Sequence, residues 1–219
     1  MGLESVKTGV IVVDVQGDFT TFKNGSLAVE GTNEAYVKAV EEGTRNFKAS
    51  GISIYATQDW HPANHISFFT SHKSKKAFDV IRLHGKDQVL WPPHCVPNTS
   101  GAEILLDKNL FKAVVKKGMD PAYDSYSGFQ DDGGKETGLD KILKEDGISK
   151  VIVYGLATDY CVRATALDAI AAGFKVVLIK NLCRGIDPET TRKALEEMRA
   201  KGVVVLENLD FEKIKGIGD

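Results

Sequence analysis

The chain has 219 residues, of which 42% are hydrophobic, and 28 Lys and Arg against 30 Asp and Glu give a formal net charge of −2. This near-neutral balance argues against partners bound through charge, such as nucleic acid or an anionic membrane surface. No run approaches the roughly 20 consecutive apolar residues of a membrane-spanning helix, and the length fits one domain with a sizeable core.

Strand-like apolar runs alternate with helical patterns along the chain. Residues 10–13 predict a buried strand, and 33–49 predict a helix that ends at Gly51. Further strands are predicted at 52–57, 113–115, 151–154, 175–179 and 203–206, and further helices at 102–110, 139–144, 161–172 and 188–200. Because such alternation builds parallel sheets with helices on both faces, we predict a three-layer α/β/α fold with a mostly parallel six-stranded sheet. Residues 1–219 are expected to form a single domain.

Two segments interrupt the alternation. Residues 58–100 hold both tryptophans and all five histidines, and residues 118–138 are rich in Gly, Asp, Ser and Tyr. Long irregular segments inside a domain are usually functional loops or disordered, and the histidines favour a functional role for the first. The three cysteines, Cys95, Cys161 and Cys183, cannot all pair, which favours a reducing, cytoplasmic location.

Polar side chains follow the predicted strands, at the sheet edge where open α/β folds bind ligands. Asp14 follows the first strand, Lys117 the third and Cys161 the fourth. At a helix start, Cys161 would be favoured as a thiolate and lie beside free backbone N–H groups, although a buried free cysteine is often only a small hydrophobe. Asp14 could accept the thiol proton or merely cap a turn. Lys117 could be a buried cation or a surface lysine, and alternation along the strand leaves open whether it or Lys116 points inward.

A metal site is the second candidate. Asp59 and His61 would share one face of extended backbone, and His94 could supply a third ligand. One carboxylate and two imidazoles suit zinc or iron. His65 is a candidate fourth ligand or a hydrogen-bond partner of a ligand, and Cys95 is a less favoured ligand.

Together and in this order, the motifs resemble the nicotinamidases among the isochorismatase-like cysteine hydrolases. The matching segments are VDVQGDF (13–19), QDWHPANHISF (58–68), WPPHCV (91–96), KG (117–118), DSYSGF (124–129) and GLATDYCV (155–162). The DWHP and WPPHC segments separate nicotinamidases from relatives that lack the metal ligands. Gly17 departs from the asparagine common at its position, and the long segment 69–90 resembles the eukaryotic-type members.

The resemblance implies roles for individual residues. The catalytic residues would be Asp14, Lys117 and Cys161, and the metal ligands Asp59, His61 and His94. A cis peptide between Leu156 and Ala157 would aim the backbone N–H groups of Ala157 and Cys161 at an oxyanion. The substrate ring would bind between Phe19 and Trp91, with Tyr126 beside them.

The resemblance further implies hydrolysis of nicotinamide to nicotinate and ammonia through a cysteine thioester, in NAD salvage. Pyrazinamide is an expected side substrate, and one divalent metal, zinc first, is the expected cofactor. Neither nucleic acid nor a membrane is an expected partner, whereas a homo-oligomer is left open.

Three alternatives differ in chemistry. A sister cysteine hydrolase would act on another amide, a carbamoyl group or a vinyl ether, without needing the metal ligands. A metal hydrolase would attack with zinc-bound hydroxide and leave Cys161 a bystander. A non-catalytic module that senses pyridine compounds would not need the three catalytic residues.

Overall fold

Six parallel strands form the central sheet. The computed structural model describes residues 6–217, so the expected domain of residues 1–219 extends beyond it at both ends. The strands are β1 (Thr8–Val13), β2 (Ser53–Asp59), β5 (Ala113–Lys117), β6 (Lys150–Gly155), β7 (Lys175–Ile179) and β8 (Val204–Leu206). Their order is β5-β2-β1-β6-β7-β8, and all pairs are parallel. The predicted six-stranded sheet is therefore confirmed. It was predicted to be mostly parallel, and the structure shows that all its strands are parallel.

The chain adds strands first on one side of β1 and then, from β6 onward, on its other side. Strands β2 and β5 extend the sheet on one side of β1, whereas β7 and β8 extend it beyond β6. In open α/β sheets such a switch point, outside the carboxyl ends of the strands, is where ligands bind. Asp14 directly follows β1 and Cys161 follows β6 after a short turn, so the topology brings these two residues to the same crevice.

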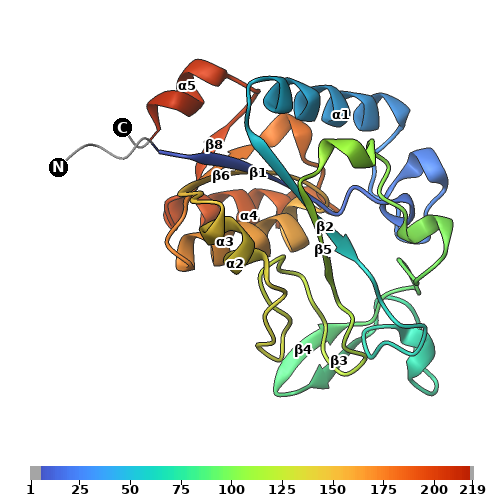
Figure 1. The fold of residues 1–219 in the computed structure, drawn as a ribbon. Coiled ribbons are helices and arrows are strands. Elements are labelled where there is room, and N and C mark those ends of the chain that lie inside the picture. The colour runs from blue at the N-terminus through green and yellow to red at the C-terminus, as the bar shows by residue number, and fades with distance from the viewer. Residues whose placement is uncertain (1–5, 218–219) are drawn as a thin grey trace.

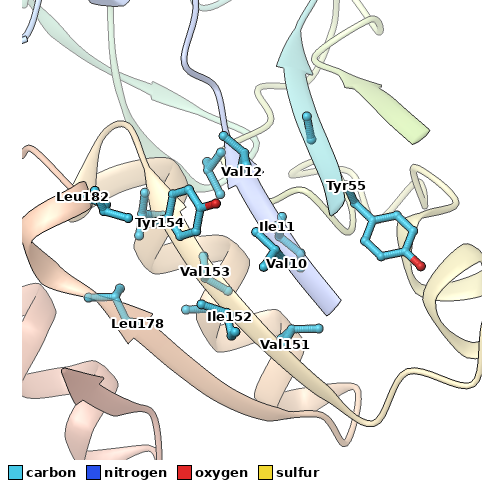
Figure 2. Packing of buried hydrophobic residues seen from close by; sticks show 14 of the residues in the cluster. Val10, Ile11, Val12, Tyr55, Val151, Ile152, Val153, Tyr154, Leu178 and Leu182 are labelled. Atoms are coloured by element: carbon cyan, nitrogen blue, oxygen red, sulfur yellow. The ribbon is translucent and has the colours of Figure 1, made fainter. Parts of the chain in front are cut away.

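The core lies on both faces of the central strands. Val10, Ile11 and Val12 of β1 lie beside the buried run of β6 (Figure 2), and all are at most 1% exposed. Strands covered on both faces read as continuous β-branched runs rather than as alternating ones, which explains why β1 and β6 could be predicted from sequence.

Helices cover the two faces of the sheet (Figure 1). Helices α1 (Glu34–Ala49) and α5 (Phe211–Gly216) lie on one face, and α2 (Leu139–Glu145), α3 (Arg163–Ala171) and α4 (Pro188–Ala200) on the other. Asn33 caps α1 by accepting the Tyr36 N–H, and Asp187 caps α4 ahead of its first-turn proline. No helix within residues 6–217 is long and apolar enough to cross a membrane.

Four local features differ from the sequence predictions. The helix predicted at 102–110 is wrong: only short 3-10 turns form at Ser100–Ala102 and Lys108–Leu110. Between them, the Glu103 carbonyl and the Leu105 N–H bond to Gly17 and Val15 of the loop after β1, which takes their backbone out of a helix. The segment 58–100 contains an unpredicted antiparallel hairpin, β3 (Val80–Leu83) and β4 (Lys86–Val89). Helix α5 was not predicted, and the predicted 161–172 helix starts earlier, as a π-helical turn at Thr158–Val162.

Candidate active site

The ammonium group of Lys117 lies at the centre of the site. The side chain, at the end of β5, is fully buried. Its Nζ lies 3.0 Å from Asp14 Oδ2 and 3.5 Å from Cys161 Sγ, and it also pairs with Asp59 Oδ1. It further donates to the Ser125 carbonyl, 2.7 Å away. One buried cation therefore contacts the predicted base, the predicted nucleophile and one predicted metal ligand.

The neighbouring lysine faces the other way. Lys116 Nζ lies 3.6 Å from the centroid of the Trp60 ring, in a cation–π contact outside the site. Alternation along β5 places adjacent side chains on opposite faces. The structure thus decides which of the two lysines points inward: it is Lys117.

Asp14 is a fully buried carboxylate between a hydroxyl and a cation. Thr57 Oγ1 donates to its Oδ1 at 2.6 Å, and Lys117 approaches its Oδ2. Burial raises the pKa of Asp14 to about 6, against the opposing effect of Lys117. Sequence reasoning missed Thr57, although its position two residues before Asp59 in β2 puts both side chains on the same face.

The thiol of Cys161 is buried at the start of the helical segment that leads into α3. Burial raises the pKa of this thiol well above its usual range, and Lys117 only partly opposes that effect. Burial and the nearby Asp14 and Asp59 carboxylates therefore oppose the thiolate that the helix start is predicted to favour. A proton acceptor is needed beside the sulfur, and Asp14 occupies that place.

The backbone before Cys161 contains the predicted cis peptide. The peptide between Leu156 and Ala157 is cis. The Ala157 carbonyl accepts hydrogen bonds from the N–H groups of Tyr160 and Val162, at 3.1 Å each. The N–H group of Cys161, which lies between them in the sequence, does not bond to this carbonyl. Helix starts leave such N–H groups available for an anion.

Asp59, His61 and His94 form a buried group of ligand atoms that all lie within 4.8 Å of one another. His61 Nδ1 bonds to the Gly118 carbonyl at 3.0 Å, and His94 Nδ1 to the Pro92 carbonyl at 2.7 Å. A carbonyl partner puts the proton on Nδ1 and leaves Nε2 with its lone pair, the arrangement typical of metal-bound histidine. These three residues fit a divalent metal.

The two further candidate ligands face elsewhere. Both ring nitrogens of His65 are occupied: Nδ1 by the Ser67 hydroxyl at 2.7 Å and Nε2 by the Tyr123 carbonyl at 3.1 Å. Cys95 Sγ points to the Gly101 carbonyl, 3.8 Å away. The His65 ring packs 4.3 Å from that of His61, so it supports the group rather than completing it.

A pocket opens onto these groups. Phe19, Trp91 and Tyr126, the three predicted aromatic residues, all line it, together with Cys161 and the metal-ligand group. Trp91 Nε1 donates to the Tyr126 hydroxyl at 3.1 Å, which joins two of the walls. Sequence reasoning missed six lining residues, which carry no motif signal or stand in matched motifs without a role: Leu27, Val29, Asp124, Ser125, Tyr160 and Ile186.

Two glycines are required by close packing near the site. A Cβ on Gly17 would lie 2.5 Å from the Ser100 carbonyl oxygen, so its departure from asparagine goes with a tightly packed loop. Gly118 has a φ of +65°, and its Cβ would lie 2.2 Å from the His61 ring. Glycine at this position lets the backbone carry a hydrogen-bond acceptor up to the imidazole.

Comparison with known proteins identifies the family. The model of the isochorismatase domain matches residues 8–209. The nicotinamidase of Escherichia coli (strain K12) is 40% identical over 213 residues, which cover 94% of this chain and 98% of that protein. The nicotinamidase of Acinetobacter baylyi is 43% identical over 198 residues, 89% of each chain.

Solved structures share the fold. The pyrazinamidase of Pyrococcus horikoshii in complex with zinc has a TM-score of 0.76 at 41% identity, covering 91% of this chain and 98% of that one. The yeast nicotinamidase bound to the inhibitor nicotinaldehyde has a TM-score of 0.85 at 30% identity, covering 92% and 100%. Because bacterial, archaeal and yeast proteins all match, the expected eukaryotic type is not established. The chain belongs to the isochorismatase family and, within it, to the nicotinamidases.

Proposed function

We propose that the protein hydrolyses nicotinamide to nicotinate and ammonia, with Cys161 as the nucleophile. The observation that carries this proposal is that Cys161, in contact with Lys117 and through it with Asp14, lines one aromatic-walled pocket together with an Asp-His-His group. The sister-hydrolase alternative gives no reason for that second group. The sensor alternative gives no reason for a buried thiol, carboxylate and amine in contact.

Asp14 acts as base and then as acid. As Cys161 Sγ bonds to the amide carbon, the thiol proton passes to Asp14, and the carbonyl oxygen takes up negative charge. Asp14 returns the proton to the departing nitrogen, which leaves as ammonia and yields a nicotinoyl thioester. Asp14 then removes a proton from the water that hydrolyses this thioester, and the thiol is restored. A pKa of about 6 suits a group that must accept and donate near neutral pH.

Lys117 and the backbone stabilise charge. The Lys117 ammonium keeps negative charge on the buried carboxylate and sulfur tolerable, since it is within 3.5 Å of both. The N–H groups of Ala157 and Cys161 would bind the oxyanion, where preorganised donors contribute most to such reactions.

Asp59, His61 and His94 would hold one divalent metal, for which we propose zinc. When bound, the metal would supply a Lewis acid that holds the ring nitrogen of the substrate. Phe19, Trp91 and Tyr126 form the walls that would orient the ring, and pyrazinamide would fit the same walls. We also propose that residues 1–219 act as one domain, in the cytoplasm and in NAD salvage.

The test is ammonia release from nicotinamide by the zinc-loaded protein, with Cys161→Ala and Cys183→Ala in parallel. Cys183 is a matched control, because it is also a buried free cysteine but bonds to the Ile179 carbonyl, outside the pocket lining. We expect Cys161→Ala to abolish release and Cys183→Ala to retain it. Release that persists in Cys161→Ala would favour the metal-hydroxide mechanism. A wild-type protein that releases no ammonia from nicotinamide but cleaves another amide would favour a sister hydrolase.

A further inference from the structure

The β3–β4 hairpin is an unpredicted element whose role the proposed mechanism does not include. It lies beyond the carboxyl ends of β2 and β5 (Figure 1). At its turn, the His84 ring stacks 4.5 Å from that of Tyr123, and His84 Nε2 bonds to the Ala122 carbonyl at 3.0 Å. The hairpin is therefore docked on the segment 118–138, which supplies residues 124–126 to the pocket.

Gln88 of β4 is a polar residue that the hairpin turns inward. It is 8% exposed, whereas the adjacent Asp87 side chain is 73% exposed. Gln88 Nε2 donates to Asp124 Oδ2 at 2.7 Å and to the Val89 carbonyl at 2.8 Å, and it lies 3.5 Å from the Tyr126 hydroxyl. Asp124 Oδ1 accepts the Ser125 N–H at 2.9 Å. Gln88 is thus bonded to a buried carboxylate that lines the pocket.

The segment 118–138 also contacts Trp91, which forms one wall of the pocket. Trp91 donates to the Tyr126 hydroxyl, next to Gln88. Two residues before β3, the Phe78 ring contacts the Trp91 ring edge-on, with centroids 6.2 Å apart. Phe78 itself is 60% exposed, so its ring lies between Trp91 and the solvent. Trp91 is therefore held by Phe78 directly and by Gln88 through Tyr126.

We propose that Gln88 is a positioning residue for substrate binding, through which the hairpin sets the Asp124–Tyr126–Trp91 side of the pocket. For its substrate the proposal rests on the proposed function. Without the Gln88 amide, the buried Asp124 carboxylate loses a close donor and must find another partner. Tyr126 and Trp91 then lose the fixed positions in which they flank the ring. Gln88 itself bonds to none of Asp14, Lys117 and Cys161, so the chemistry at Cys161 should be largely kept.

Gln88→Leu removes the amide at similar size, and Asp87→Asn is the matched control on the same strand. Asp87 forms an exposed ion pair with Arg82, so its variant disturbs the hairpin surface and not the pocket. We expect Gln88→Leu to raise KM for nicotinamide about ten-fold while kcat stays within about two-fold, the pattern of a lost binding contribution. Asp87→Asn should leave both unchanged.

Tryptophan emission gives a readout that does not depend on turnover. We expect the emission of Gln88→Leu to shift to longer wavelength than that of wild type and of Asp87→Asn, because a displaced Tyr126 would leave Trp91 more exposed to water. An unchanged KM, an equal rise in KM for Asp87→Asn, or an unshifted emission would each overturn the proposal. If the wild-type protein does not turn over nicotinamide, the proposed function fails, and the emission shift alone then decides the role of Gln88.

Discussion

The hydroxyl of Thr57 gives a direct test of Asp14 as the catalytic base. Thr57→Val keeps the shape of the side chain and removes the 2.6 Å hydrogen bond to Asp14 Oδ1. A hydrogen bond to a charged group is worth about 1.5–3 kcal/mol. Because this bond favours the ionised carboxylate, and one pKa unit corresponds to about 1.4 kcal/mol, its loss should raise the pKa of Asp14 by about 1–2 units.

The sign of the effect on activity follows from the role of Asp14. A protonated carboxyl group cannot accept the thiol proton, so kcat/KM should fall as pH drops through the pKa of Asp14. We expect that limb near pH 6 in the wild-type protein, because burial raises the pKa of Asp14 to about 6. In Thr57→Val it should lie near pH 7 to 8, about 1–2 units higher. The variant should therefore lose most activity in mild acid and approach wild-type activity in mild alkali.

The assay is the pH profile of kcat/KM for ammonia release, measured for wild type, Thr57→Val and Thr44→Val. Thr44 is the matched control, because it is also a fully buried threonine. It lies in α1, and its hydroxyl bonds to the hydroxyl of Tyr154 in β6 at 2.8 Å, outside the site. The Thr44→Val limb should coincide with that of wild type. A Thr57→Val limb that stays in place or moves to lower pH would refute Asp14 as the titrating base.

Three further predictions concern the buried charges and the metal group. Lys117→Met should lower the free energy of unfolding in urea by about 3–5 kcal/mol, because it leaves the buried carboxylates of Asp14 and Asp59 without their cation. A loss below about 1 kcal/mol would contradict a buried ion pair between Lys117 and these carboxylates. His94→Ala should lose bound zinc by elemental analysis whereas His65→Gln keeps it, and equal losses would assign His65 as a ligand. Gly118→Ala should also reduce zinc content, because its Cβ would lie 2.2 Å from the His61 ring; full zinc occupancy would show that the loop can shift.

Sequence periodicity predicted the sheet well and the segment around it poorly. The strands with continuous apolar runs are buried on both faces, so their pattern alone reports their environment. The hairpin at Val80–Leu83 and Lys86–Val89 alternates only weakly and is largely exposed, so no such pattern marks it. The segment 102–110 has an apolar pattern that suits a helix, but its backbone donors and acceptors are taken by the loop after β1.

The candidate site shows a similar division. The motifs around Asp14, Asp59 and Cys161 follow predicted strands, and this position predicted that they would meet if the strand order brought those strand ends together. The partners of these residues come from elsewhere in the chain: Thr57 reaches Asp14 from β2, and Gln88 reaches Asp124 from the hairpin. Such pairs are 43 and 36 residues apart in the sequence, and neither has a local signal.

By itself, the sequence determined the alternating α/β architecture, the strand ends that carry chemistry and the family to which the motifs belong, because these depend on local pattern and on the shared edge of a parallel sheet. Only the tertiary structure decided that Lys117 rather than Lys116 points inward and that His65 has both ring nitrogens occupied. It also placed the Cys161 thiol where burial raises its pKa. Protonation and ligand identity depend on desolvation and on contacts between distant segments, and both exist only once the chain has folded.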